Sequence, residues 1–258
     1  MAGSWRNSRR RGVIAKRADP AIGLLFCDQV LLAINKPAGL LSLPDGYDLA
    51  IPHAANLLEP RFGSLWVVHR LDRHASGVLL LARSADAHRE LNRQFEGRRV
   101  VKLYHALVVG DPAWQVRTIR LPLRIDGDRL HRTVIDIRNG KPASTHFRVM
   151  ERFGRYTLVE ASPHTGRRHQ IRAHLAAAGH PIIADGLYGD GRGLYLSELK
   201  PGFQAGRSEE CPLLGRLGLH AWSLTFEHPL QRFPMVIEAP YPKDFSAALR
   251  QLRRYPVR

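Results

Sequence analysis

The sequence of 258 residues predicts an α+β fold organised around a mainly antiparallel sheet. Segments with the residue pattern of strands outnumber those with the pattern of helices. The two kinds do not alternate regularly along the chain, and tight turns join several of the predicted strands. A parallel α/β sheet needs regular alternation of strands and helices, so these features favour antiparallel pairing.

The predicted strands are short runs of apolar or alternating residues between turn formers. Residues 24–27 and 30–34 form one predicted hairpin, and residues 141–148 and 156–161 form a second around Phe153 and Gly154. The apolar runs 65–68 and 78–82 suit strands that are covered on both faces. The other predicted strands are residues 100–109, 218–226 and 233–239, and residues 117–140 alternate as solvent-facing hairpins do.

Three stretches have the apolar spacing of amphipathic helices. The first runs from a Ser84 cap to Glu96, before Gly97, and the last covers residues 242–253. The middle helix is predicted between a Thr165 cap and Gly179. We also expect residues 192–217 to form a surface insertion, because they combine Gly, Pro and charge with little periodicity.

On the predicted middle helix, Arg168 and Arg172 are four positions apart, so they are expected to stack on one side.

The charge balance indicates a polyanionic partner. The chain has 39 Lys and Arg against 23 Asp and Glu, a net charge of +16. Basic side chains that neutralise phosphates gain from the release of counterions, so nucleic acid is the expected partner. Residues 1–19 read as a disordered basic tail ahead of one domain at residues 20–258.

No membrane or disulfide signal accompanies this composition. The longest apolar runs have five or six residues, far fewer than the ~18 of a membrane-spanning helix. The first residues lack the apolar segment of a signal peptide, so we expect a cytoplasmic protein. Cys27 and Cys211 are isolated, which supports neither a disulfide framework nor a cysteine zinc site.

A cluster of ionisable residues at 69–74 lies between two predicted buried strands. Its one carboxylate, Asp72, stands among two arginines and two histidines. Nearby positive charge favours the ionised form, which a nucleophile or a base needs. A salt-bridged surface loop is the alternative interpretation, because structural ion pairs produce the same pattern.

Four histidines between residues 164 and 180 suggest a metal site, but their spacing argues against one. Zinc-binding helices present ligands four residues apart, whereas His169 and His174 are five apart and no acidic or cysteine ligands accompany them. We therefore predict no metal.

Several motifs resemble those of the RluA-type pseudouridine synthases. HRLD at 69–72, followed by ASG at 75–77, resembles the catalytic motif, although Ala75 stands where the family has Thr. VLLAINKPAGLLSLP at 30–44 is similar to the first family motif, and Lys-x-Tyr-x-Ala at 102–106 to the tyrosine motif. HTGRRHQIRAHLAAAGHPIIADGLYG at 164–189 resembles the third, and Leu-His-Ala at 219–221 the last element.

This resemblance implies a fold and a reaction. The fold is a bent mixed sheet with flanking helices and an RNA cleft across it, here without the added N-terminal RNA-binding module of some members. The reaction is isomerisation of uridine to pseudouridine within ribosomal or transfer RNA. No atom is gained or lost, so the resemblance implies no cofactor and no metal.

The resemblance also assigns roles to individual residues. Asp72 acts on the ribose, either by attacking the anomeric carbon or by removing a neighbouring proton, and Arg172 pairs with it. Tyr104 stacks on the uracil. The substrate-binding positions are Arg70, which supports the extruded nucleotide, Arg167 and His169, which hold adjacent motif positions, and Leu219, which walls the base pocket.

Two other classes of function explain part of the pattern. A noncatalytic RNA-binding or ribosome-assembly protein accounts for the charge but not for Asp72 and its separately encoded arginine partner. A metal-dependent nuclease needs clustered carboxylates, and Asp72 has no acidic neighbour between residues 65 and 83. We therefore expect a pseudouridine synthase that acts on RNA as a monomer.

Overall fold

The computed structural model describes residues 22–203 and 209–256. Its strands are β1 (Gly23–Cys27), β2 (Leu31–Lys36), β3 (Trp66–Val67), β4 (Ser76–Ala82), β5 (Val101–Val109), β6 (Val116–Ile119), β7 (Leu123–Arg124), β8 (Val134–Ile135), β9 (Thr145–Arg152), β10 (Tyr156–Pro163), β11 (Leu219–Glu227) and β12 (Pro234–Glu238). Its α-helices are α1 (Ala54–Phe62), α2 (Ala85–Glu96), α3 (Gln170–Ala177) and α4 (Lys243–Arg254), and Leu196–Glu198 form a 3₁₀ turn. The predicted basic tail, residues 1–19, lies outside the described part of the chain.

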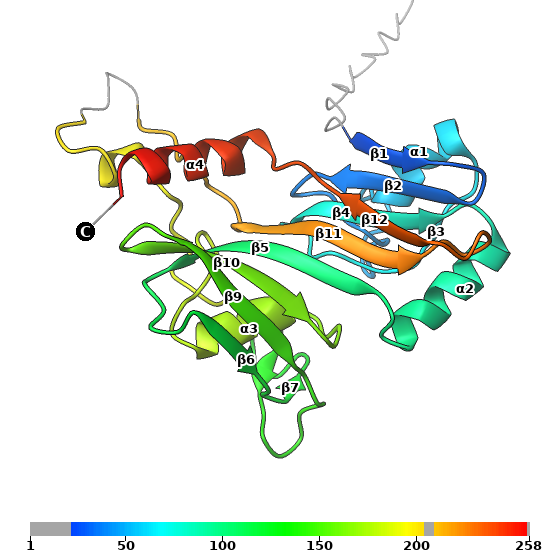
Figure 1. Ribbon diagram of the computed structural model, residues 1–258, viewed down its shortest axis with the longest axis horizontal. Coiled ribbons are helices and arrows are strands. Elements are labelled where there is room, and N and C mark those ends of the chain that lie inside the picture. The colour runs from blue at the N-terminus through cyan, green and yellow to red at the C-terminus, as the bar shows by residue number, and fades with distance from the viewer. Residues whose placement is uncertain (1–21, 204–208, 257–258) are drawn as a thin grey trace, which may run out of the picture.

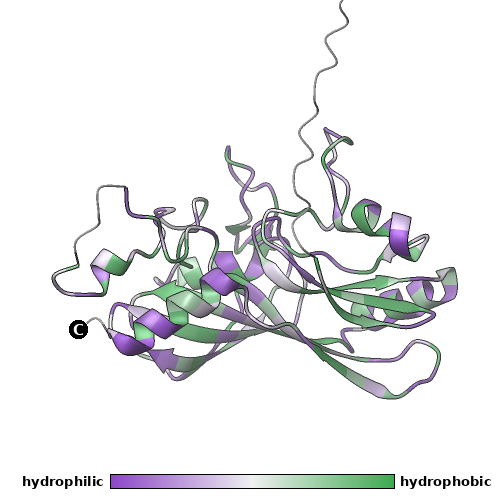
Figure 2. Cartoon of the chain, turned by 90° about the horizontal axis from the view of Figure 1, so that it is seen from above, coloured by the Kyte–Doolittle hydropathy of each residue, from purple (hydrophilic) through white to green (hydrophobic). Residues whose placement is uncertain are grey.

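One large sheet runs through the molecule in the order β1-β2-β4-β11-β5-β10-β9-β6, with β12 paired to β11 and β3 to β4. Every pair is antiparallel except β11 with β4, which run parallel. The sheet curves between a half built on β2 and β4 and a half built on β9 and β10 (Figures 1 and 2). The expected mainly antiparallel, bent mixed sheet is confirmed.

Helices flank both faces of the sheet because neighbouring strand residues point to opposite faces. Leu107 of β5 belongs to a core cluster with Phe245 of α4. The adjacent Ala106 belongs to a different cluster with Ile171 of α3. Two helices therefore cover the same half of the sheet from opposite sides.

Several predicted elements are confirmed. The first hairpin is β1 paired with β2, and the later one is β9 paired with β10. Helix α2 begins after Ser84, whose hydroxyl accepts a hydrogen bond from the Ala87 amide at 3.2 Å. None of the described helices is both long and apolar enough to cross a bilayer.

The start predicted for the middle helix is wrong. Helix α3 begins at Gln170, after His169 in a left-handed conformation. The Thr165 hydroxyl does not cap it but donates to Gln170 Oε1 at 2.6 Å. Arg168 therefore precedes the helix and pairs with Asp126, so the prediction that both arginines lie on one side of this helix is wrong.

Residues 192–217 also differ from the prediction in the parts that are described. Leu194, Leu199 and Leu214 are buried against α4 rather than carried on a surface insertion. Isolated apolar residues in a segment rich in Gly and Pro give no periodic signal, and only the tertiary packing shows their role.

Candidate active site

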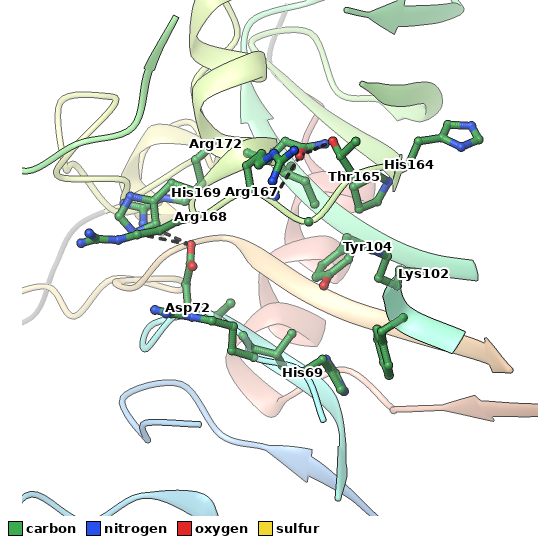
Figure 3. Close-up of a pocket in the computed structure, with 18 of the residues that line it drawn as sticks. His69, Asp72, Lys102, Tyr104, His164, Thr165, Arg167, Arg168, His169 and Arg172 are labelled. Carbon is green, nitrogen blue, oxygen red and sulfur yellow. Dashed lines mark hydrogen bonds and ion pairs between the residues drawn. The ribbon is translucent and has the colours of Figure 1, made fainter. Parts of the chain in front are cut away.

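The predicted site residues line one pocket of about 600 Å³. The walls come from the loop before β4, strand β5, the turn leading into α3, and the start of β11 (Figure 3). The residues placed there by the sequence are Asp72, Tyr104, Arg172, Arg70, Arg167, His169 and Leu219. Segments up to about 150 positions apart in the chain meet at this pocket.

The backbone on both sides of Asp72 is fixed by the segment after β2. Ser42 Oγ accepts from the Leu71 amide at 3.0 Å and donates to the Leu71 carbonyl at 3.1 Å. On the other side, the Gly39 amide donates to the Arg73 carbonyl at 2.8 Å. These three hydrogen bonds form a backbone clamp that holds Asp72 in position without using its carboxylate oxygens.

The buried Lys36 side chain adds further hydrogen bonds to this backbone clamp. Its side chain is fully buried, and Nζ donates to the carbonyls of Pro37, Leu40 and Arg73 at 2.9, 2.8 and 3.2 Å. Burial lowers the pKa of Lys36 to about 7, while the negative charge of Asp72 opposes that shift. Three carbonyl acceptors match the three protons of an ammonium, so the charged form of Lys36 is fully hydrogen-bonded although it loses its proton more readily than an ordinary lysine.

Gly77 follows the loop that carries Asp72 and packs closely against β11, the strand that carries Leu219. It has φ +117°, and a Cβ at this position would lie 2.2 Å from the Ala221 carbonyl oxygen. Glycine permits both the conformation and the close approach of β4 to β11. The preceding Ala75 is buried and lines the pocket with a methyl group.

Arg172 contacts two carboxylates at once. Its Nη1 lies 3.3 Å from Asp72 Oδ2, and its Nε and Nη2 donate to the two oxygens of Asp185 at 2.8 and 2.7 Å. The side chain of Asp185 is buried and also accepts from the amides of Leu187 and Tyr188. Sequence reasoning paired Arg172 with Asp72 alone, whereas the shorter, two-point ion pair is with Asp185.

Burial lowers the pKa values of both histidines of the predicted cluster, His69 and His74, and also that of His169 from the third motif. Burial lowers the pKa of His69 to about 3; its Nε2 accepts from the Leu80 amide at 3.0 Å, and its ring stacks on Phe95. Burial also lowers the pKa of His169 to about 4, although its Nε2 is 4.0 Å from Asp72 Oδ2. The cations beside Asp72 are therefore Arg172 and, more remotely, Lys36.

Tyr104 lines the pocket, and its hydroxyl stays protonated at neutral pH. Burial, followed by the negative charge of Asp72, raises the pKa of its hydroxyl. Among the described residues, that hydroxyl has no hydrogen-bond partner, so it is available to a substrate. Figure 3 shows the ring across the pocket from Asp72.

The predicted substrate-binding residues surround this centre. Arg70 is exposed at the rim, and Arg167 is half-buried with Nε 3.4 Å from the Pro142 carbonyl. Within the described ranges, neither guanidinium has a carboxylate oxygen within 4.0 Å. Leu219 is buried in the pocket wall.

Gln170 and Asp185 are contributors that sequence reasoning did not assign. Gln170 Oε1 accepts from Thr165 Oγ and the Arg167 amide, and its Nε2 donates to the Ser144 carbonyl. These contacts shape the turn that carries Arg167 and His169. Both residues lie within the third motif, and that position is the only sign in the sequence that they contribute to the site.

No group of three His, Cys, Asp or Glu side chains suited to a metal ion occurs among residues 22–203 and 209–256.

Comparison with known proteins assigns the chain to a family. Residues 30–177 match the family model described as RNA pseudouridylate synthase, which is more than half of the chain. The chain belongs to the RNA pseudouridylate synthase family. It is 38% identical over 232 residues to the Ribosomal large subunit pseudouridine synthase C of Haemophilus ducreyi, covering 89% of this chain and 69% of the relative.

Other members of the family give the same result. Identity to the Ribosomal large subunit pseudouridine synthase D of Nitrosomonas europaea is 36%, over 90% of this chain and 66% of the relative. Among solved structures, Human RNA Pseudouridylate Synthase Domain Containing 4 superposes with a TM-score of 0.69 at 29% identity, covering 90% of this chain and 93% of that one. The predicted fold and family are confirmed, and the chain is an RNA pseudouridine synthase rather than a noncatalytic RNA-binding protein.

Proposed function

We propose that this enzyme isomerises a uridine of large-subunit ribosomal RNA and that Asp72 starts the reaction. The names of its relatives, Ribosomal large subunit pseudouridine synthase C and D, support the choice of RNA. The meeting of Asp72, Arg172 and Tyr104 in one pocket is the observation that carries the choice of residues.

Asp72 acts on the ribose as an ionised carboxylate. It either attacks the anomeric carbon or removes a neighbouring proton, and both routes require an oxygen that is fixed in place. The backbone clamp on Leu71 and Arg73 provides that placement, and Arg172 at 3.3 Å stabilises the negative charge.

The reaction exchanges one bond for another within the same nucleotide. The bond from ribose to a ring nitrogen breaks, uracil turns in the pocket, and a ring carbon joins the sugar. That carbon loses a proton and the released nitrogen gains one, so the atoms balance without a co-reactant. Tyr104 stacks on the uracil while it turns, and its protonated hydroxyl can take part in the late proton transfer.

The target nucleotide has to leave the RNA stack to reach the buried end of this pocket. Arg70 at the rim supports the extruded nucleotide, and Leu219 walls the base. Arg167 and His169 complete the wall from the turn before α3. We further propose that residues 20–258 act as one catalytic domain and as a monomer in the cytoplasm.

Pseudouridine mapping tests the substrate. Large-subunit ribosomal RNA and transfer RNA are compared between a strain lacking this gene, its parent, and deletion strains that express wild type or Asp72→Asn. We expect at least one ribosomal pseudouridine to disappear on deletion and to return only with wild type. Loss confined to transfer RNA would contradict the proposed substrate, and restoration by Asp72→Asn would contradict the proposed role.

A purified reaction tests the proposed absence of metal chemistry. Isomerisation in EDTA, with the RNA left uncut, is the expected result, whereas loss of turnover that a divalent ion restores would contradict it.

A further inference from the structure

The pocket extends past Tyr104, away from the catalytic carboxylate. Lys102 and Tyr104 are two positions apart on β5, so both side chains project from the same face of the sheet. Figure 3 shows Tyr104 between Asp72 and Lys102. Phe95 and Arg98, from the end of α2 and the segment after it, also line the pocket, and the charge of Arg98 acts on Lys102 at this further end. None of the roles derived above uses it.

The Lys102 ammonium lacks an anionic partner. Among the described residues, no carboxylate oxygen lies within 4.0 Å of Nζ, and Nζ donates no hydrogen bond. It reaches the turn before α3, where a Cβ built on Gly166 would lie 3.9 Å from it. Burial, and then the charge of Arg98, lower the pKa of Lys102.

A part-buried cation without a partner is unfavourable, because it has lost water without gaining an opposite charge. A bound anion at this position would relieve that cost. Glu96 also lines the pocket but lies outside the 4.0 Å limit. We therefore expect an anionic group outside the described chain to pair with the Lys102 ammonium.

A second, shallower groove continues from the same end of the pocket. It shares Arg98, His164 and Thr165 with the first pocket and extends to Arg120 and Pro142. Arg98 and Arg120 are exposed, and within the described residues neither has a carboxylate within 4.0 Å. Lys102, Arg98 and Arg120 thus form a continuous path of uncompensated positive charge.

We propose that Lys102 binds a backbone phosphate adjacent to the target uridine and that the RNA strand then follows the shallow groove past Arg98 and Arg120. The proposal rests on RNA being the substrate. Phosphates are the only groups of unmodified RNA that carry negative charge at neutral pH. A uracil carbonyl can accept a hydrogen bond but cannot neutralise the ammonium.

The salt dependence of RNA binding measures this contact. Affinity for a short oligouridylate is determined over a range of salt concentrations for wild type, Lys102→Met, Lys102→Arg and Lys243→Met. Methionine keeps the unbranched stem without the charge, and Lys243 is an exposed lysine at the start of α4, which packs on the opposite face of the sheet.

For each lost phosphate contact with a single strand, the slope of log affinity against log salt should become shallower by about 0.7. We expect that change for Lys102→Met, a wild-type slope for Lys243→Met, and a largely restored slope for Lys102→Arg. Arg98→Ala and Arg120→Ala should each add a similar change. A wild-type slope and affinity for Lys102→Met would overturn the proposal.

A base-free probe separates phosphate from uracil as the ligand. An oligomer of the same length with ribose and phosphate but no bases is bound by wild type and by Lys102→Met. We expect the substitution to weaken binding of the two oligomers by the same factor. A loss confined to the oligouridylate would mean that Lys102 contacts the base, and the proposal would be wrong.

These binding experiments need no turnover. RNA binding that depends on Lys102, without pseudouridine formation, would contradict the proposed function and leave this inference standing. If wild type forms pseudouridine but the Lys102→Met variant keeps the wild-type salt slope, the proposed function would stand and this inference would be wrong.

Discussion

Arg172 holds two carboxylates that differ in exposure and in purpose. Asp185 is buried and binds the guanidinium at two points, so it fixes the orientation of the arginine. Asp72 faces the pocket and receives only the remaining Nη1 contact at 3.3 Å. A planar guanidinium can serve both partners at once, whereas a lysine ammonium cannot reproduce that geometry.

Asp185→Asn should therefore lower turnover through Arg172 without a direct contact to substrate. The amide has nearly the same shape but removes the charge that orients the guanidinium, and breaking a buried ion pair costs about 3–5 kcal/mol of stability. We expect kcat to fall while RNA affinity stays within a few fold. Arg172→Lys should lower kcat in the same way.

A double-mutant cycle of Asp185→Asn with Arg172→Met, read by chemical unfolding, checks the pairing. The two substitutions should show a coupling free energy of about 0.5–3 kcal/mol, because each single change breaks the same buried ion pair. Additive effects on stability would mean that the two side chains do not interact.

The buried Lys36 side chain should make the free energy of unfolding depend on pH. Its pKa is lowered from 10.5 to about 7 by burial in the folded protein. Between these values the unfolded chain binds the proton more strongly, so this group makes stability rise with pH across the window. The free energy of unfolding of wild type, relative to Lys36→Met, should increase from about pH 7 to about pH 10 by a few kcal/mol. Parallel stability curves for the two proteins would contradict this.

At the scale of elements, local sequence signals predicted most strands and the long amphipathic helices. Helix α2 followed its Ser84 cap because the cap and the helix are adjacent in sequence. The start of α3 was missed because Gln170, five positions later, takes the Thr165 hydroxyl and holds residues 164–169 as a turn. Ser144, from a distant segment, completes that network.

The β7–β8 hairpin and its loop reach the pocket through Ile125 and are tied to its edge by one ion pair. Asp126 Oδ1 accepts from Arg168 Nη1 at 2.7 Å, and both side chains are partly exposed. Such a pair is worth less than about 1 kcal/mol, so a phosphate can compete with Asp126 for Arg168. The hairpin therefore limits how much positive charge the pocket offers to RNA.

Asp126→Asn should release Arg168 and tighten RNA binding. We expect higher affinity for oligouridylate and a salt slope that is steeper by up to about 0.7. Asp136→Asn is a matched control, because Asp136 pairs with Arg124 within the same hairpin and is not part of the pocket lining. Equal affinities for wild type and Asp126→Asn would show that Arg168 does not contact RNA.

At the scale of the whole molecule, the motifs identified the pocket, but not the contacts that organise it. Asp72 and Arg172 are 100 positions apart, and their meeting could be expected only from the family resemblance. Lys36 and Asp185 both lie inside recognised motifs. No local pattern shows that Lys36 donates to the Arg73 carbonyl or that Asp185 binds the Arg172 guanidinium. Burial of Leu194 and Leu214 against α4 likewise depends on packing that a sequence without periodicity does not indicate.

The distribution of charge over the molecule is consistent with a large RNA. The net charge of +16 favours association with any polyanion, and the pocket adds uncompensated cations at its rim and further end. Asp72 is a carboxylate in the same pocket, beside Arg172 and near the positions where RNA would bring phosphates. A negative charge at this position opposes the binding of phosphates, which agrees with the proposed role of Asp72 in the chemical step.

Turnover and binding by Asp72→Asn therefore test the central claim most directly. Large-subunit ribosomal RNA from a strain lacking this gene is incubated with wild type or Asp72→Asn, and its nucleosides are separated to quantify pseudouridine, with RNA affinity measured in parallel. Pseudouridine formation by Asp72→Asn should be abolished, while its affinity stays within a few fold of wild type or rises, because removing a negative charge cannot weaken phosphate contacts. Appreciable pseudouridine formation by Asp72→Asn would contradict the assignment of Asp72 as the residue that acts on the ribose.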